Sequence, residues 1–334
     1  MSGELEGKSI LLIAPRFFGY EGRICDEIAS RGADVDFYND RVFDHPLFKV
    51  ILRLKLNFIV WPIVHLFFRK ILTRNDYDYV LVISPEGLPY GWVENARTKL
   101  PKATFVLYMW DSFLNKPKGA KLAPLFDRVL SFDKKDCEKT EEVLFRPLFF
   151  TAKDSVKCQQ QQADESIDLC FAGSLHGDRY NVVERIKSEA ISKDISFYSF
   201  YFFSNKMVLK LLKCLSRNFK SVDVDHVSFK PLSYQEFLSL MQSSRAIVDI
   251  QSESQSGLTM RTLEVLAMGK KFITTNEEVL KYDFFHPDNI YVVDRFDPIL
   301  NPVFFEKRYQ PIDSEILDRY SAAYWLDEVL GLRD

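Results

Sequence analysis

Short apolar runs alternate with amphipathic segments along most of the chain. The run at 9–14, SILLIA, is apolar almost throughout, which is typical of a strand buried on both faces of a parallel sheet. Residues 21–33 follow with helical spacing and include Gly32, a suitable C-terminal cap. Further strands are predicted at 34–39, 77–84, 103–111 and, more weakly, 126–133. This order of strand, helix and strand predicts an open α/β sheet over residues 1–150.

A polar stretch at 151–166 interrupts this alternation. It contains four consecutive glutamines and no periodicity, so we interpret it as a surface linker. The pattern then restarts and predicts a second α/β domain over 165–312. Its predicted strands are 167–174, 195–203, 245–251, 271–276 and 289–294, with helices at 179–191, 234–244 and within 256–270. A last helix is predicted at 313–330, within a C-terminal segment, 313–334, that packs back on the first domain.

The composition excludes some classes of protein and favours others. A chain of 334 residues is longer than one compact domain usually is, which agrees with two domains. A net charge of −3 and a pI near 6.0 do not indicate a nucleic-acid-binding protein. Five scattered cysteines without a CxxC motif indicate a reducing compartment. The acidic N-terminus is unlike a secretory signal, and no apolar run reaches the length of a membrane span, so we expect a cytoplasmic protein.

Residues 46–73 are strongly apolar but also contain five lysines and arginines. In one interpretation they form one or two helices packed on the sheet, with the long cations reaching water. Pro62 would kink or divide a helix there. In the other interpretation the segment is an interfacial patch that rests on the anionic inner membrane.

A first candidate site follows the predicted strand at 167–174. The strand ends at Gly173 and Ser174, and a helix begins after Asp178. A glycine permits close approach of the backbone, and the N–H groups at a helix start suit an anion, with His176 and Arg179 as further donors. The alternative is an ordinary turn in which Asp178 caps the helix.

A second candidate site lies in SGLTMRTLEVLAMGKKFITTN, residues 256–276. Gly257, Leu258 and Thr259 are expected to place N–H groups at the positive end of a helix dipole. Arg261 has the fork geometry that binds phosphate, and Glu264 lies one turn further on nearly the same face. A carboxylate there can accept hydrogen bonds from ribose hydroxyls. The alternative is an ion pair between Arg261 and Glu264 on a solvated face.

With these two motifs in order, the chain resembles GT-B glycosyltransferases. It is similar to the group 1 branch of spore-coat maturation proteins and enzymes of capsule and lipopolysaccharide synthesis. Gly173-Ser174 followed by Arg179 matches one signature, and RTLEVLAMGKKFIT, from Arg261, matches the other. The resemblance implies two Rossmann-like domains facing a central cleft and a C-terminal helix that crosses back to the first domain. Ser256 stands eight residues before Glu264, where retaining members carry a first glutamate.

The resemblance also implies roles for individual residues. Glu264 would hold the ribose of a nucleotide-sugar donor, and residues 257–259 with Arg261 would hold its diphosphate. The segment around Lys230 to Leu232 would border the nucleobase. The donor is a substrate, and no cofactor is expected. The histidines are isolated and there is no DxD motif, so no metal site is predicted and the enzyme is expected to be metal-independent.

The first domain is expected to bind the acceptor. Asp111 and Glu86 follow buried strands, where a carboxylate can take a proton from an attacking hydroxyl. Asp133 and Asp136 lie further along, toward the hinge, and each of these four carboxylates taken singly is more often a cap or an ion-pair partner. The loop at 16–21 follows the first strand. In one interpretation its glycine contacts the acceptor or the donor, and in the other the loop is a plain connecting turn.

The function that follows is the transfer of a hexosyl or related group to a bacterial surface glycan. The acceptor would be a lipopolysaccharide, O-antigen or capsule precursor, lipid-linked and at the cytoplasmic face of the inner membrane. A nucleotide-sugar epimerase of the same fold and a non-catalytic nucleotide-sugar-binding subunit remain alternatives. A nicotinamide oxidoreductase is least supported, because no GxGxxG follows the first strand.

Overall fold

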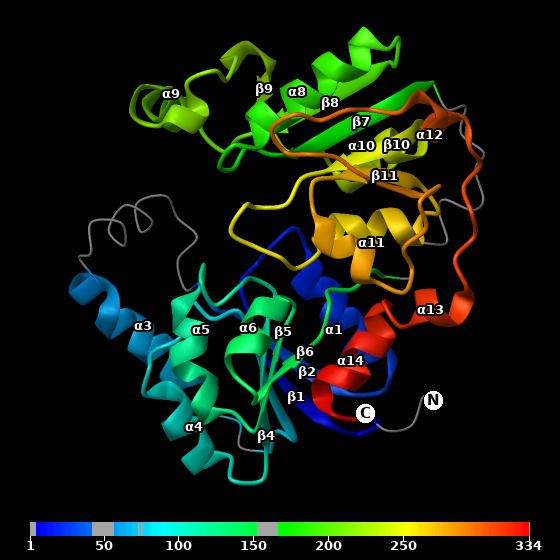
Figure 1. Ribbon diagram of the computed structural model, residues 1–334. Coiled ribbons are helices and arrows are strands. Elements are labelled where there is room, and N and C mark those ends of the chain that lie inside the picture. Colours follow the sequence, from blue (N-terminus) through cyan, green and yellow to red (C-terminus); the bar gives the residue numbers. More distant parts are fainter. Residues whose placement is uncertain (1–4, 42–56, 73, 75, 152–165, 334) are drawn as a thin grey trace. The chain divides into compact units, whose positions relative to one another are not determined.

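The computed structural model describes residues 5–41, 57–72, 74, 76–151 and 166–333, and the chain divides into two compact units (Figure 1). Unit 1 consists of residues 1–147 and 322–334, and unit 2 of residues 148–321. Each unit is built on its own parallel sheet flanked by helices.

The sheet of unit 1 contains, among the described residues, six parallel strands in the order β2-β1-β3-β4-β5-β6. Their bounds are β1 Ser9–Ala14, β2 Asp34–Asn39, β3 Tyr79–Ile83, β4 Thr104–Met109, β5 Arg128–Ser131 and β6 Val143–Phe145. All six residues of β1 are buried, because β1 pairs with β2 on one side and β3 on the other and both its faces are covered. The predicted strands 9–14 and 34–39 are confirmed residue for residue.

The helices of unit 1 connect these strands. They are α1 Tyr20–Ser30, α3 Asn57–Ile71, α4 Trp92–Lys99, α5 Pro117–Leu122, α6 Lys134–Lys139 and α14 Ala322–Leu330. Helix α1 ends as predicted, with Gly32 in the left-handed region at φ +80°. Helix α14 comes from the C-terminal end of the chain and packs on α1 and β4, where the ring of Trp325 meets Tyr108 edge-on at 4.9 Å. The expected return of a C-terminal helix to the first unit is therefore confirmed.

The sheet of unit 2 has the order β12-β11-β10-β7-β8-β9, with every described pairing parallel. Its strands are β7 Ile167–Ser174, β8 Phe197–Phe202, β9 Val227–Ser228, β10 Ser244–Asp249, β11 Lys271–Thr274 and β12 Ile290–Val292. The helices are α8 Arg179–Ser192, α9 Lys206–Leu215, α10 Tyr234–Gln242, α11 Met260–Ala267, α12 Pro302–Glu306 and α13 Ser314–Asp318. Apolar residues of β7, β10 and α8 form a continuous core, including Leu169, Val248 and Ile186.

Both sheets have a point at which the direction of the strand order reverses. In unit 1 the chain runs from β1 to β2 and then returns to the other side of β1 as β3. In unit 2 it runs from β7 through β8 to β9 and then returns to the other side of β7 as β10. Ligands of open α/β sheets bind beyond the carboxyl ends of the strands at such reversal points. The topology therefore directs attention to the loops after β1 and β3, and after β7 and β10.

Two predictions about helices need correction. Helix α3 continues through Pro62 and is not divided there, because a proline removes only one N–H donor and the turns on either side still form. The single helix predicted at 313–330 is two helices, α13 and α14. They are separated where Ser321 pairs with Phe150 in a parallel β-bridge, a contact that requires extended backbone. Residues 46–56, and most of the predicted linker, lie outside the described residues.

Among the helices that the structure describes, none combines the length and the apolar character needed to span a bilayer.

Candidate functional site

A pocket of about 410 Å³ lies at the reversal point of unit 2. One wall is the turn from β7 into α8, and the other is the loop that leaves β10 toward α11. The pocket is lined by His176, Gly177, Asp178, Arg179, Asn218, Gln251, Ser252, Glu253 and Ser254. Two residues of the first predicted site, His176 and Arg179, therefore share one pocket.

The turn before α8 gathers the first predicted group. Gly177 adopts φ +53°, a conformation that favours glycine, and this turns the chain from β7 into α8. The Arg179 guanidinium folds back and donates to the carbonyl of Ser174 at 3.0 Å, while His176 is exposed. There is little space for a side chain at Gly173, because an added Cβ would lie 2.9 Å from the Phe171 ring.

Asp178 stands at the N-cap of α8, but its side chain makes no capping hydrogen bond. It forms a two-pronged ion pair with Arg295, at 2.8 Å from Nε and 2.6 Å from the second nitrogen. This pair lowers the pKa of Asp178. Arg295 also donates to the Thr275 hydroxyl and the Gln251 carbonyl, each at 3.2 Å, so it joins the segments after β7, β10, β11 and β12. Arg295 was not among the predicted site residues, although it directly follows the predicted strand at 289–294.

Asp249, the last residue of β10, fixes the start of α11. Its carboxylate accepts hydrogen bonds from the hydroxyls of Thr259 and Thr262, both at 2.6 Å. Thr259 is the N-cap and accepts from the Thr262 N–H at 3.3 Å. Gly257 and Leu258 are buried just before it, and the Asn276 amide donates to the Gly257 carbonyl at 3.4 Å. The predicted helix start is thus present, with a carboxylate already at its positive end.

Arg261 and Glu264 form a pair inside unit 2 rather than on a solvated face. Their closest atoms, Nε and Oε2, are 3.6 Å apart, and Glu264 is only 5% exposed. The Arg261 guanidinium donates to the Ala172 carbonyl at 2.7 Å and lies over the Phe237 ring at 4.1 Å. Its Nε is buried without a hydrogen bond. Because Ala172 directly precedes Gly173, this contact joins the two predicted motifs at the end of β7.

Lys230 and Leu232 lie in the segment between β9 and α10. Lys230 is exposed and its N–H bonds to the Ser228 hydroxyl at 3.2 Å. The segment leads into α10, which begins with a capping box and presents Phe237 to Arg261. The predicted nucleobase segment therefore leads, through Phe237 of α10, to Arg261.

Three guanidinium groups occupy this region together. Withdrawal from solvent lowers the pKa of Arg179; the charge of Asp249 opposes the shift, while those of Arg261 and Arg295 add to it. Arg295 is paired with Asp178, Arg261 lies 3.6 Å from Glu264, and Arg179 donates to the Ser174 carbonyl. An anion that entered this region would meet donors already oriented, with little side-chain ordering left to perform.

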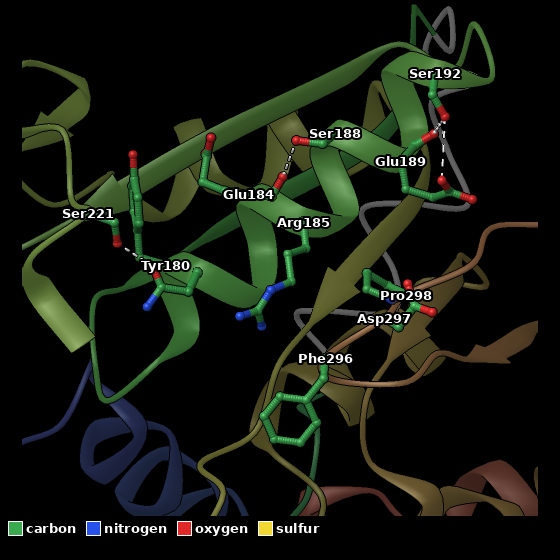
Figure 2. A pocket seen from close by; sticks show the side chains of 11 residues that line it. Tyr180, Glu184, Arg185, Ser188, Glu189, Ser192, Ser221, Phe296, Asp297 and Pro298 are labelled. Carbon is green, nitrogen blue, oxygen red and sulfur yellow. Dashed lines mark hydrogen bonds between the residues drawn. The ribbon is translucent and has the colours of Figure 1, made fainter. Parts of the chain in front are cut away.

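A larger hollow of about 650 Å³ runs along α8 (Figure 2). Its charged lining is mainly acidic, with Glu184, Glu189 and Asp297 against Arg185. Several of these groups already bond within the protein: Glu184 accepts from the Tyr201 hydroxyl at 2.6 Å. This hollow is therefore less suited to a phosphate than the smaller pocket.

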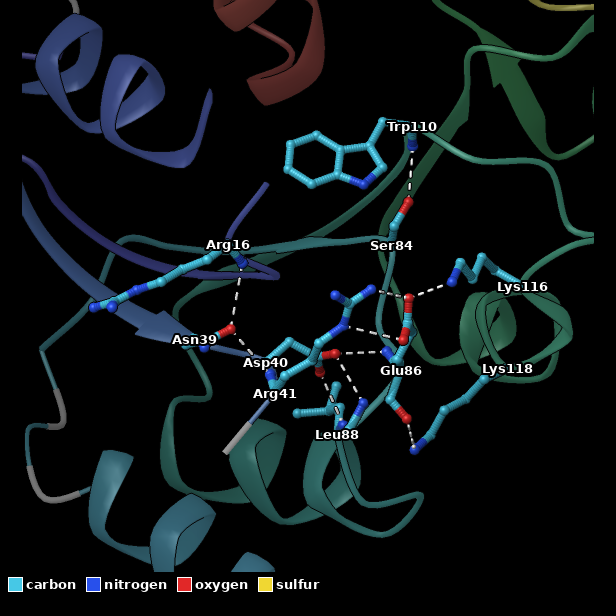
Figure 3. A network of polar contacts seen from close by, with 11 residues as sticks. Arg16, Asn39, Asp40, Arg41, Ser84, Glu86, Leu88, Trp110, Lys116 and Lys118 are labelled. Atoms are coloured by element: carbon cyan, nitrogen blue, oxygen red, sulfur yellow. Dashed lines mark hydrogen bonds and ion pairs between the residues drawn. The ribbon is translucent and has the colours of Figure 1, made fainter. Parts of the chain in front are cut away.

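At the reversal point of unit 1, buried Asp40 organises the turn after β3 (Figure 3). Its carboxylate accepts three backbone N–H bonds, from Glu86 at 2.6 Å, Gly87 at 2.8 Å and Leu88 at 2.9 Å. Burial raises the pKa of Asp40, and the three hydrogen bonds act against that rise. Gly87 is required here, since a Cβ would lie 2.1 Å from the Asp40 carbonyl oxygen.

Glu86 is held in this turn by cations (Figure 3). Arg41 donates to both carboxylate oxygens, at 3.1 and 2.6 Å, and Lys116 donates to one of them. The Lys118 ammonium donates to the Glu86 carbonyl at 2.9 Å. Partial burial raises the pKa of Glu86, but the two ion pairs outweigh it and hold the pKa below the ordinary value. A carboxylate stabilised in this way is a weak proton acceptor, which argues against Glu86 as the base.

Asp111 lies two residues beyond the end of β4 and is half-buried. It accepts a hydrogen bond from the Asn115 amide at 3.0 Å. The neighbouring Trp110 N–H donates to the Ser84 hydroxyl at 2.9 Å, and the Trp110 ring lies 6.0 Å from that of Phe17. The loops after β1, β3 and β4 therefore meet beside Asp111.

Asp133 and Asp136 have structural roles. Asp133 caps α6, and buried Asp136 accepts from the Ser131 hydroxyl at 2.7 Å and the Phe113 N–H at 3.0 Å. The interpretation of these two residues as caps or partners agrees with these contacts.

Comparison with solved structures identifies the fold. A glycosyltransferase from Rickettsia africae superposes with a TM-score of 0.57 at 15% identity, over 97% of each chain. HepE from Anabaena, in complex with UDP and glucose, gives 0.56 at 10% identity, over 97% of this chain and 99% of HepE. The chain has the GT-B fold. No protein-family model matches the sequence, and no curated protein is significantly similar to it.

The GT-B fold is not confined to one reaction. The UDP-GlcNAc 2-epimerase of Methanocaldococcus jannaschii gives a TM-score of 0.50 at 12% identity, over 98% of this chain and 100% of the epimerase. The two-sheet architecture predicted from the sequence is confirmed, and the reaction has to be argued from the site.

Proposed function

We propose that this protein is a glycosyltransferase that moves a sugar from a nucleotide-sugar donor to an acceptor hydroxyl. The observation that carries the proposal is the pocket at the reversal point of unit 2, which Arg179 lines and where Arg295 bonds to the lining residues Asp178 and Gln251. A nucleotide diphosphate carries its charge and its ribose hydroxyls a few ångströms apart. Arg179 and the N–H groups before α11 are the proposed donors for the former, and Glu264 is the proposed acceptor for the latter. The similarity to solved glycosyltransferases, one of them bound to UDP, supports this choice.

In this proposal the diphosphate lies where α8 and α11 begin. The N–H groups of Gly257 to Thr259 and the Arg261 guanidinium are the predicted donors to it, with Arg179 adding charge. Glu264 holds the ribose, and the Arg261 Nε lies 3.6 Å from its carboxylate. The segment from Lys230 to Leu232 borders the base.

The acceptor is proposed to bind unit 1, with Asp111 as the base that takes the proton of the attacking hydroxyl. Asp111 is half-buried and follows Trp110, where the loops after β1, β3 and β4 meet. Glu86 is proposed to position the Arg41 and Lys116 side chains at the turn after β3. The reaction balances: the acceptor oxygen forms a bond to the anomeric carbon, the bond to the diphosphate breaks, and Asp111 receives the proton.

The finer parts of the proposal concern the acceptor. We propose a bacterial surface glycan precursor, such as a lipid-linked lipopolysaccharide, O-antigen or capsule intermediate. Catalysis is proposed to need no metal, since cationic side chains and helix N-termini supply the charge at the diphosphate. Contact of residues 46–73 with the cytoplasmic face of the inner membrane belongs to the same proposal.

The deciding experiment incubates the protein with uridine, guanosine and thymidine diphosphate sugars, with and without a bacterial lipid-glycan extract. Release of nucleoside diphosphate that depends on the extract, and persists with a chelator, is the expected result. Conversion of the donor sugar without an acceptor would instead identify an epimerase. Binding without turnover would identify a non-catalytic subunit.

The donor site is tested separately by Glu264→Gln, which keeps the shape of the side chain but removes its charge. Loss of a charged hydrogen bond to a ribose corresponds to about 1.5–3 kcal/mol, or roughly a 10- to 150-fold weaker affinity for the bound nucleotide. Glu184→Gln is the matched control, since Glu184 is also hydrogen-bonded in unit 2 but lines the larger hollow. Equal affinities for both variants in calorimetry would show that Glu264 does not contact the ribose.

A further inference from the structure

Helix α9 exposes an unusual number of apolar side chains on unit 2. Met207, Leu211 and Leu215 are 80%, 58% and 74% exposed. They are four residues apart, so they form one stripe along the helix. Leu209, on another face, is fully buried and anchors the helix to the core. Helix α9 thus presents apolar side chains both to the core of unit 2 and to solvent.

The border of this stripe is basic. Lys206 and Lys210 are exposed beside it, and Arg217 and Lys220 follow in the next turn. No aspartate or glutamate occurs between Asp194 and Asp223, although the whole chain has a net charge of −3. The cations are therefore gathered on α9 and the turn after it, and the nearest acidic residues along the chain are Asp223 and Asp225, on the short helical turn that α9 contacts.

The helix is firmly held in place. Asn205 caps it by accepting the N–H groups of Met207 and Val208, at 2.9 and 3.1 Å, and the Lys213 ammonium donates to the Val222 carbonyl. Helix α9 lies at the β9 edge of the sheet, against the short helical turn that precedes β9 (Figure 1). The exposed stripe is consequently presented by a preformed element, which avoids the cost of ordering a helix on binding.

We propose that α9 is a docking surface for the anionic face of a phospholipid bilayer. The apolar stripe would enter the boundary between headgroups and acyl chains, and the lysines would meet lipid phosphates. A second copy of this chain fits less well, because a two-fold contact through α9 would bring its lysines toward those of the partner. The surface belongs to unit 2, and the inference does not depend on the identity of the donor or the acceptor.

The test is co-sedimentation of the full chain with vesicles of phosphatidylcholine alone and of phosphatidylcholine mixed with phosphatidylglycerol. Binding is expected only to the anionic vesicles and is expected to weaken with salt. Reversal of two charges, Lys206→Glu with Lys210→Glu, should weaken the partition constant at least about 30-fold, given the attraction of each cation near such a surface. Leu211→Ser should weaken it roughly tenfold or more through lost apolar contact.

Matched controls change the same residue types elsewhere. Lys99→Glu with Lys102→Glu alters two exposed lysines of unit 1, and Ile191→Ser alters a residue of α8 that is 60% exposed. Both variants should bind vesicles as the unaltered protein does. The far-ultraviolet circular dichroism spectrum and the thermal transition, measured in parallel, should be unchanged in the α9 variants and show that they are folded.

Three results would overturn the proposal. The first is equal binding to both kinds of vesicle by the unaltered protein, or binding to neither. The second is unchanged binding by the α9 variants together with loss of binding on reversal of Arg53 and Lys55, which would locate the membrane contact in residues 46–73. The third is a dimer, seen by light scattering without lipid, that Leu211→Ser disperses. Failure of the glycosyltransferase assay would leave the vesicle result unaffected, so the two proposals fail independently.

Discussion

Replacing Arg295 by glutamine tests how much its ion pair with Asp178 contributes to the stability of unit 2. The guanidinium makes two hydrogen bonds to the Asp178 carboxylate and two to neutral oxygens of Gln251 and Thr275. The pair is mostly withdrawn from water, with side-chain exposures of 11% for Arg295 and 22% for Asp178. Removing one partner of a fully buried pair costs about 3–5 kcal/mol and of an exposed pair about 0–1, so we expect about 2–4 kcal/mol. Arg295→Gln should destabilise unit 2 by that amount.

The positions of the tryptophans decide which spectroscopic probe reports the unfolding of each unit. Trp61, Trp92, Trp110 and Trp325 are the four tryptophans of the chain, and all fall within unit 1. Tryptophan fluorescence therefore reports the unfolding of unit 1, whereas far-ultraviolet circular dichroism reports both units. Urea unfolding of Arg295→Gln should lower the stability seen by circular dichroism.

The control is Lys281→Gln, which breaks an ion pair of similar length, 2.7 Å to Glu278, in which the lysine side chain is 62% exposed. Because this pair is well solvated, the change should cost no more than about 0.5–1 kcal/mol. Equal effects of the two substitutions would refute the argument that burial sets the cost at Arg295.

The effect should also depend on pH. Because Arg295 lowers the pKa of Asp178, the pair stabilises the folded state fully above the pKa of an unfolded aspartate, about 3.9. That stabilisation is lost as the pH falls through the lower pKa of the folded state. The difference between the unaltered protein and Arg295→Gln should be constant from about pH 7 to 5 and should shrink below about pH 4. A difference that stayed the same down to the lowest pH at which the protein folds would rule out Asp178 as the partner that matters.

Two further substitutions test unit 1. Gly87→Ala would place a Cβ 2.1 Å from the Asp40 carbonyl oxygen, so we expect a loss of more than about 3 kcal/mol in the fluorescence-detected transition. Gly22→Ala, in α1 with no atom within 4 Å of the added Cβ, should instead stabilise by roughly 0.5–1 kcal/mol, and similar losses in both would contradict this reasoning. Asp111→Asn should leave nucleotide affinity unchanged but slow transfer by about 100- to 10,000-fold, the usual contribution of a general base. Turnover near that of the unaltered protein would show that another group accepts the proton.

The elements that the sequence predicted well are those with a strong local pattern. The runs at 9–14 and 167–174 match β1 and β7 residue for residue, because the fully buried part of each strand is apolar. Gly32 marks the end of α1 because its φ of +80° is costly for other residues. Helix α9 was missed, although its sequence is strongly amphipathic, with Lys206, Lys210 and Lys213 spaced along one side.

The amino-acid sequence by itself determined two parallel α/β units, the motifs at 173–179 and 257–264, and the carboxylates that follow strands. Only the tertiary structure decided which of these groups meet. Asp178 pairs with Arg295 across 117 residues, Asp40 closes the turn at Glu86 across 46, and Arg261 reaches Ala172 across 89. Such partners are chosen by the order of strands within a sheet, which places the ends of distant segments side by side. Alternation of strands and helices predicts that sheets form, but it does not specify that order.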